Sequence, residues 1–227
     1  MLYWIFKHLI IGPLLKTIYR PWVEGSENIP ATGPVILVGN HLSVIDSFFM
    51  PVMVDRRVYF LAKSDYFAGK GLKGWLVKNF MLGVGQLPID RSGGKASEAS
   101  LTTGLSVLDR GDVLGIYPEG TRSPDANLYR GRTGVARLVL ESCATVVPVV
   151  MIDTEKAMPI GAKLPRIRRI GTVIGKPLDF SRFNGMSADR FVLRSVTDEI
   201  MVEIQKLSGQ KYVDVYASSV RARAQQA

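Results

Sequence analysis

Three short polar clusters in the sequence contain residue types that can move a proton or bind a phosphate. In the first, His41 and Asp46 are five positions apart, and Asn40 directly precedes the histidine. Five residues of a regular helix turn through about 500°, so these side chains would not share a helical face. They can meet if His41 lies in a loop and Asp46 in the first turn of the next helix. A carboxylate there would fix the imidazole tautomer and raise its basicity, which suits proton removal from a hydroxyl.

The other two clusters contain cations that suit an anionic substrate. Residues 118–123 read Pro-Glu-Gly-Thr-Arg-Ser, and Arg130 and Arg132 follow shortly after. Backbone N–H groups, a hydroxyl and a guanidinium in one tight loop can together hold a phosphate. The remaining cluster ends at Asp90 and Arg91, a pair that is by itself more often a structural salt bridge than a substrate contact.

Direct attack by a substrate hydroxyl is favoured over a covalent intermediate. Ser43 lies near His41, but no Gly-x-Ser-x-Gly elbow surrounds it. The single cysteine, Cys143, lies in an apolar stretch, so we expect an inert core residue. One cysteine excludes an intramolecular disulfide and favours a reducing compartment. His41 and Asp46 are too few ligands to predict a metal site.

The polar clusters lie at the ends of apolar runs, which is where α/β proteins place their sites. We expect strands at 35–38, 58–62, 84–89, 113–117, 145–152 and 169–174, and helices at 46–54, 72–80, 97–108, 133–142 and 187–207. Strands that alternate with helices predict a single α/β domain, here residues 24–210. The last of these helices has Phe191, Val192, Val196, Ile200 and Ile204 at helical spacing. Residues 211–227 form a polar tail that we expect to be poorly packed.

The N-terminal residues 1–23 are strongly apolar but do not form an uninterrupted apolar run. They are broken by Lys7, His8, Pro13, Lys16, Arg20 and Pro21. A spanning helix requires about 20 mostly apolar residues, and a secretory signal requires a basic start and a cleavage site, so neither is expected. Aromatic residues near both ends, with cations between them, favour a helix in the membrane interface. The alternative is a helix that caps the domain's own core.

The net charge points to an anionic partner. The 29 Lys and Arg against 20 Asp and Glu give +9, and residues 163–194 carry eight basic and two acidic side chains, or +6 of that excess. Such a balance suits a nucleic acid, an anionic membrane or a phosphorylated substrate, although a solvated basic face is the simpler alternative. No nucleic-acid motif accompanies the charge, so we expect no nucleic-acid partner.

Together, the clusters resemble the sequence blocks of the glycerolipid acyltransferases related to bacterial 1-acylglycerol-3-phosphate (lysophosphatidic acid) acyltransferase. The four blocks of that family are matched, in order, by His41 to Asp46, by residues 85–91, by residues 118–123 and by the apolar residues 146–149. The match therefore covers residues 35–150, and the third block is present without a change. Many members of the family also have a basic residue two positions before a glycine that follows the third block. Arg132 is the basic residue at that position in this sequence.

The resemblance implies roles for these residues. His41 would be the general base, and Asp46 would orient it and stabilise the imidazolium while an acceptor hydroxyl attacks an acyl thioester. The implied acceptor-binding residues are Arg91, Glu119, Gly120, Thr121, Arg122 and Arg132. Arg91 and Arg122 would bind the acceptor phosphate, because a guanidinium can bind phosphate oxygens bidentately.

The leading hypothesis is therefore an enzyme that makes phosphatidic acid from lysophosphatidic acid, with acyl-CoA or acyl carrier protein as co-substrate and no other cofactor. The acceptor could instead be glycerol 3-phosphate, another lysophospholipid or a glycolipid. A membrane-binding protein without catalysis is the alternative from another class. The family implies a mixed α/β domain with an acyl-chain groove or tunnel and an N-terminal helical element in the bilayer. We expect the protein on the anionic cytoplasmic face of the cell membrane, where its donor is available.

Overall fold

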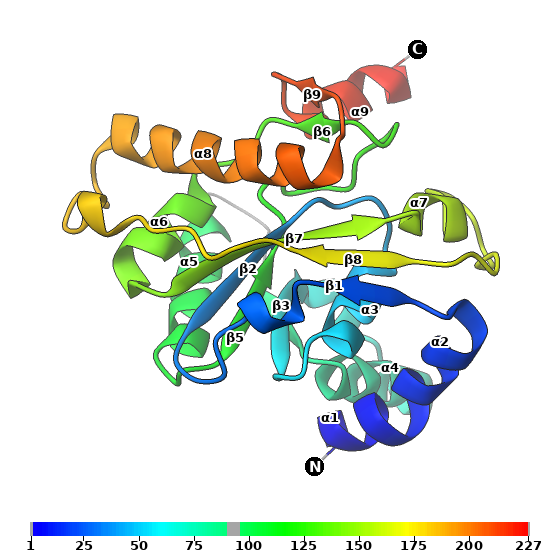
Figure 1. Ribbon diagram of the computed structural model, residues 1–227. Helices are drawn as coiled ribbons and strands as arrows, with labels where there is room; N and C mark the ends of the chain where they lie inside the picture. Colours follow the sequence, from blue (N-terminus) through cyan, green and yellow to red (C-terminus); the bar gives the residue numbers. More distant parts are fainter. Residues whose placement is uncertain (1, 90–95, 227) are drawn as a thin grey trace.

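A central mixed sheet organises the protein, whose computed structural model describes residues 2–89 and 96–226 (Figure 1). Within these residues, seven strands pair in the order β1-β8-β7-β2-β5-β3-β4. Their bounds are β1 Trp22–Glu24, β2 Val35–Gly39, β3 Val58–Lys63, β4 Gln86–Ile89, β5 Val113–Ile116, β7 Thr145–Ile152 and β8 Gly171–Ile174. β2 is parallel to both of its neighbours, whereas β8 is antiparallel to β7. A separate pair joins β6 Leu128–Tyr129 to β9 Tyr212–Val213.

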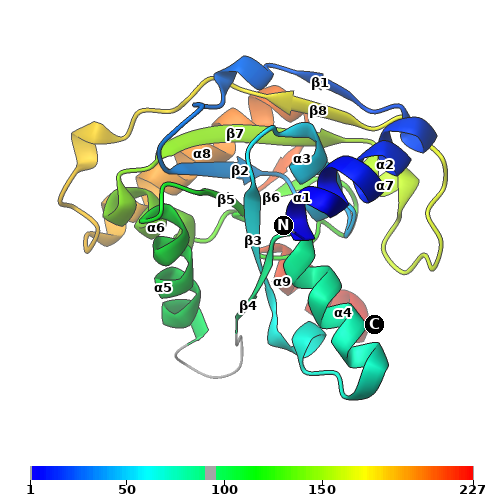
Figure 2. The same cartoon turned by 90° about the horizontal axis from the view of Figure 1, so that it is seen from below.

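Helices cover both faces of this sheet (Figure 2). The α-helices are α1 Leu2–Ile5, α2 Ile11–Tyr19, α3 Asp46–Met53, α4 Gly71–Gly83, α5 Ala96–Leu108, α6 Gly134–Ser142, α7 Thr154–Ala157, α8 Arg190–Ser208 and α9 Ala217–Gln226. The short helical segments are η1 Phe6–Ile10, η2 Ser26–Asn28, η3 Ser64–Phe67 and η4 Ser181–Phe183. The predicted single α/β domain with a mixed sheet flanked by helices is therefore confirmed.

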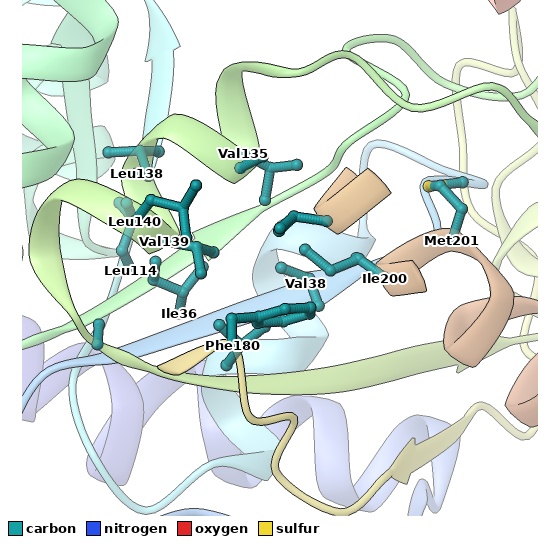
Figure 3. Close-up of a cluster of buried hydrophobic side chains, with 14 of the residues drawn as sticks. Ile36, Val38, Leu114, Val135, Leu138, Val139, Leu140, Phe180, Ile200 and Met201 are labelled. Atoms are coloured by element: carbon teal, nitrogen blue, oxygen red, sulfur yellow. The ribbon is translucent and has the colours of Figure 1, made fainter. Parts of the chain in front are cut away.

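The central strand β2 is buried on both faces, which explains its continuous apolar sequence. Ile36 and Val38 pack into a cluster with residues of α5, α6 and α8, shown in Figure 3. Val35 and Leu37 point to the other face and pack with residues of α2 and α3. Because both faces are packed, the end of β2 is a rigid support for the loop that contains Asn40 and His41.

The long helix α8 begins at Arg190, three residues later than the predicted start at residue 187. Asp189 accepts hydrogen bonds from the backbone N–H groups of Phe191 and Val192 and so caps the helix. Phe191 is 88% exposed, whereas Leu193 is buried against the core. The other expected strands and helices are present, with ends that differ by a few residues.

Two predictions from the sequence are wrong. Cys143, expected in the core, is exposed at the C-cap of α6, where its φ is 50°. The C-terminal tail, expected to be poorly packed, instead forms β9 and α9. Two backbone hydrogen bonds attach this tail: one from the N–H of Leu128, the first residue of β6, to Lys211 O, and one from the N–H of Arg130, directly after β6, to Val215 O. The sequence did not predict this pairing, because the tail is polar and a strand of two residues, as in β9, has no recognisable alternation of apolar and polar residues.

The N-terminal segment, residues 2–19, is attached to the domain through its inner face. The hydroxyl of Tyr3 accepts a hydrogen bond from Val58 N–H at 3.1 Å. The ammonium of Lys7 donates to the carbonyls of Val54, Asp55 and Arg56, which follow α3, and burial lowers its pKa to about 8. In the part of the chain that the structure describes, no helix is both long and apolar enough to cross a membrane.

Candidate active site

His41 and Asp46 meet as their spacing allows. His41 lies in the loop after β2, and Asp46 is the first residue of α3. Nδ1 of the imidazole lies 2.8 Å from Oδ2 of the fully buried carboxylate. The same oxygen accepts hydrogen bonds from the backbone N–H groups of Leu42 and Ser43, both at 2.8 Å. With Nδ1–H donating to Asp46, Nε2 is the ring nitrogen that is free to accept a proton.

The face of the imidazole is held by Tyr117, at the end of the neighbouring strand β5. The two rings are stacked, with centroids 3.9 Å apart and planes 6° from parallel. The Tyr117 hydroxyl lies 3.1 Å from Oγ of Ser47 on α3, and burial raises its pKa well above the ordinary value, so it stays neutral. This contact was not predicted from the sequence. The signal available was the position of Tyr117 at a strand end, directly before the loop 118–123.

Glu119 connects the loops that follow β2 and β5. Its carboxylate is 1% exposed; Oε1 accepts from His41 N–H at 3.3 Å, and Oε2 accepts from Tyr129 N–H at 2.9 Å. In return, Ser123 N–H donates to the carbonyl of His41 at 2.7 Å. The main chain of His41 is therefore fixed on both sides by the loop 118–123. Glu119 is a positioning residue for the imidazole in this arrangement.

Burial gives Glu119 a pH dependence that can be measured. Burial raises its pKa from 4.5 to about 7. Because the folded-state value is the higher one, the protonated carboxyl stabilises the fold below about pH 4.5, and this contribution is lost as pH rises through about 7. A shift of this size corresponds to about 3 kcal/mol. We therefore expect the free energy of unfolding of the wild type, relative to Glu119→Gln, to fall by about 3 kcal/mol between pH 4.5 and 7.5.

Urea denaturation of both proteins across that range measures the difference. The comparison with Glu119→Gln cancels the contributions of other titrating groups, since both chains share them. A difference that does not change with pH would contradict the raised pKa of Glu119.

The loop 118–123 has a glycine where its geometry requires one. Gly120 has a φ of +73°, and a Cβ placed there would lie 3.1 Å from Cδ and Nε of Arg132. Arg132 in turn donates its backbone N–H to the carbonyl of Pro118 at 2.8 Å. The aliphatic part of Arg132 therefore lies against the loop 118–123.

The remaining predicted acceptor residues have different surroundings. Oγ1 of Thr121 accepts a hydrogen bond at 2.7 Å from Arg221, in the C-terminal helix α9. Arg122 is half-buried and has no hydrogen bond or ion pair to any residue that the structure describes. Arg91, together with Asp90, lies outside the described residues.

Two further polar residues in the first cluster have structural contacts. The side chain of Asn40 continues the pairing of β2 with β7, since it accepts from Met151 N–H at 2.8 Å and donates to Met151 O at 3.1 Å. Ser43 is buried, and its hydroxyl donates to Met158 O at 2.6 Å. A nucleophilic serine would have to give its hydroxyl proton to a base, whereas Ser43 donates that proton to a backbone carbonyl. This contact agrees with the expectation that no acyl-enzyme forms.

A narrow apolar pocket lies beside this site. It is lined by the N-terminal segment, α3 and the end of α4, through Tyr3, Phe6, Lys7, Ile11, Ser47, Phe48, Pro51, Val52, Gly83 and Val84. Ser47 belongs to the pocket and also contacts Tyr117, the residue stacked on His41. Contacts through Ser47 and Tyr117 therefore link the pocket to the imidazole.

Comparison with known proteins identifies the class of protein. A family model described as acyltransferase matches residues 20–152, more than half of the chain, including all the clusters discussed above. The chain belongs to the acyltransferase family.

Several named relatives share parts of the sequence. The chain is 28% identical to the chloroplastic 1-acyl-sn-glycerol-3-phosphate acyltransferase LPAT1 of Arabidopsis thaliana, over 72% of this chain and 45% of that protein. It is 26% identical to the 1-acyl-sn-glycerol-3-phosphate acyltransferase of Bacillus subtilis, over 82% of this chain and 86% of the relative. The chain thus spans less than half the length of the chloroplast relatives it matches.

A solved structure supports the fold. The crystal structure of the 1-acyl-sn-glycerophosphate acyltransferase PlsC from Thermotoga maritima superposes with a TM-score of 0.61. The match covers 86% of this chain and 80% of that one, at 21% sequence identity. At this identity, the likeness establishes a shared architecture.

Proposed function

We propose that the protein transfers a fatty acyl chain from an acyl thioester to the free hydroxyl of lysophosphatidic acid, giving phosphatidic acid. The observation that carries this proposal is the His41–Asp46 contact at 2.8 Å, in which hydrogen bonds with Glu119 and Ser123 hold the main chain of His41 on both sides. The names of the plant and bacterial relatives support lysophosphatidic acid as the acceptor. Acyl-CoA or acyl carrier protein is the proposed co-substrate.

The geometry suggests a sequence of proton transfers at one nitrogen. Nε2 of His41 takes the proton of the acceptor hydroxyl as the hydroxyl oxygen bonds to the thioester carbonyl carbon. Asp46 stabilises the imidazolium that forms, because its carboxylate contacts Nδ1. The carbon–sulfur bond then breaks, and the imidazolium returns the proton to the leaving thiolate. The products are an ester and a free thiol, and His41 is neutral again.

Acceptor and donor occupy different sides of this pair in the proposal. Thr121, Arg122 and Arg132 bind the acceptor phosphate, and Arg91, which lies outside the described residues, is proposed as a further ligand of that phosphate. The apolar pocket beside Ser47 takes the start of an acyl chain, since its lining is mostly aromatic and aliphatic.

Transfer of label from palmitoyl-CoA to a panel of acceptors tests the proposal. We expect phosphatidic acid from lysophosphatidic acid and no acyl transfer to lysophosphatidylcholine, glycerol 3-phosphate or a glycolipid. Transfer to one of the other acceptors, but not to lysophosphatidic acid, would replace the proposed acceptor. No product with any acceptor, from CoA or carrier-protein donors, would favour the non-catalytic membrane-binding alternative.

The exposed face of the N-terminal segment supports contact with the anionic cytoplasmic membrane surface. Its inner face is occupied by Tyr3 and Lys7, while its outer face leaves large apolar side chains in water: Leu2, Trp4, Leu9, Ile10, Leu14 and Ile18 are 38–62% exposed. The neighbouring helix α4 adds Leu72, Trp75 and Leu76, and the basic loop before β8 adds Leu164 and Ile167. Apolar side chains set among lysines and arginines suit a bilayer that carries anionic lipids.

Replacing two of these side chains should weaken membrane binding. Leu9 and Leu14 are 62% and 55% exposed, and burying a leucine is worth about 1.5–3 kcal/mol. We therefore expect the double variant Leu9→Ser, Leu14→Ser to bind phosphatidylglycerol vesicles at least about tenfold more weakly in a sedimentation assay.

The matched control changes two exposed apolar residues of α8, Phe191→Ser and Val202→Ser, which lie on the opposite face of the sheet. This control should bind vesicles like the wild type. Equal losses in both double variants would show that the N-terminal face has no special role.

A further inference from the structure

The C-terminal segment is tied to the active-site loops at three points along its length. Gln210 accepts a hydrogen bond from Asn40 at 2.9 Å, directly beside the catalytic histidine. Ser218 accepts one at 2.9 Å from Nη2 of Arg132. Arg221 donates from Nη1 to Thr121 at 2.7 Å. These contacts bring α9, which begins seven residues after Gln210, against the loop 118–123 (Figure 1).

The side chains at this contact are cations without acidic partners. Among the described residues, no carboxylate forms an ion pair with Arg122, Arg132 or Arg221. A guanidinium has five N–H donors, and Arg221 uses one of them on Thr121. Arg132 and Arg221 both contact the loop 118–123, and like charges brought to one loop repel one another. A phosphate dianion offsets that repulsion and accepts hydrogen bonds from their free N–H groups.

The two arginines nearest the loop are also held in place. The guanidinium of Arg132 lies over the ring of Tyr216, 5.2 Å from its centroid, in addition to its hydrogen bond to Ser218. Arg221 is half-buried and fixed by Thr121. Pre-positioned donors lose less conformational freedom when an anion binds, which favours a binding role over a solvated surface role.

We propose that Arg221 is a further acceptor-binding residue, which binds the phosphate monoester of lysophosphatidic acid together with Arg122 and Arg132. This inference rests on the proposed function, because it takes the loop 118–123 as the wall of the acceptor site. Thr121 then acts by orienting Arg221, and α9 is part of the substrate site.

Steady-state kinetics of the full chain test this role, with lysophosphatidic acid and palmitoyl-CoA varied separately. We expect Arg221→Ala to raise KM for lysophosphatidic acid about tenfold or more, as for loss of one hydrogen bond to a charged group, and to leave KM for palmitoyl-CoA within twofold. Arg221→Lys should recover part of the loss, since it keeps the charge. Arg223→Ala, two positions along the same helix and so about 200° around it, should leave both constants within twofold.

Three outcomes would overturn the inference while leaving the proposed function intact. An unchanged KM for lysophosphatidic acid in Arg221→Ala would show that α9 does not bind the acceptor. A lower KM for lysophosphatidic acid would show that Arg221 competes with the acceptor for Thr121 and so blocks the site. Equal increases in the KM values of both substrates would also contradict it, since they would indicate a general structural role.

Equilibrium binding separates this inference from the catalytic proposal. In the His41→Ala background, which should not turn over, calorimetry can measure binding of the soluble hexanoyl lysophosphatidic acid. Adding Arg221→Ala should weaken this binding about tenfold. If the wild type formed no product yet binding fell in this way, the proposed reaction would be wrong and the phosphate contact would stand. If the wild type were active and binding were unchanged, only the role of Arg221 would be wrong.

Discussion

Replacing His41 with alanine is expected to lower kcat for acyl transfer at least ~100-fold, and up to ~10,000-fold, which is the range that a positioned general base contributes. The reason is that Nε2 accepts the hydroxyl proton in the proposed reaction, and the only other histidine, His8, lies in the N-terminal segment. The fold should survive, because the loop is also held through the main chain of residue 41, by Glu119 and Ser123. The measurement is the rate of phosphatidic acid formation at saturating donor and acceptor.

The sequence provides a matched control, since it has only one other histidine. His8 lies in the N-terminal segment, exposed and next to Trp4. In a detergent assay, His8→Ala should keep kcat near the wild-type value. Wild-type kcat in His41→Ala would show that the imidazole is not the base.

The second large effect is expected for Asp46→Asn. The amide oxygen can replace Oδ2 and still accept from Nδ1 of His41 and from Leu42 N–H and Ser43 N–H. It has no negative charge, however, so the imidazolium formed during transfer loses its stabilising partner. We expect kcat to fall about 100- to 10,000-fold, the scale on which an oriented base depends on its carboxylate, with little change in KM for either substrate.

The same substitution should also reduce stability. Oδ1 of Asp46 is buried and has no hydrogen-bond partner among the described residues, so the amide NH₂ would occupy an unsatisfied position. Leaving a buried donor unsatisfied costs about 1–3 kcal/mol, which urea denaturation can measure. If Asp46→Asn kept kcat within threefold of the wild type but lost this stability, Asp46 would have only a structural role in fixing the loop that contains His41.

The sequence contained enough to predict the contact between His41 and Asp46 and most of the fold. Apolar runs and polar breaks placed the strands, because buried strands of a parallel sheet are apolar on both faces. The spacing of His41 and Asp46 excluded contact on one helical face but allowed it in a loop followed by a helix start, and the structure has that geometry. These features depend on residues that are close together in the sequence.

The remaining parts of the site depend on contacts between distant segments. Tyr117 reaches the imidazole only because β5 pairs with β2, and no local pattern contains that pairing. Arg221 reaches Thr121 across 100 positions, through a polar tail whose two-residue strand gives no periodic signal. The exposure of Cys143 likewise follows from its place at the end of α6, where the chain turns with a positive φ.

One experiment tests the central claim most directly, that the His41–Asp46 pair transfers an acyl chain to lysophosphatidic acid. Purified wild-type protein and His41→Ala are incubated in parallel with labelled palmitoyl-CoA and lysophosphatidic acid, and labelled phosphatidic acid is quantified. We predict product from the wild type and at least ~100-fold less from the variant. Equal rates from both proteins, or no product from the wild type with either CoA or carrier-protein thioesters, would contradict the claim.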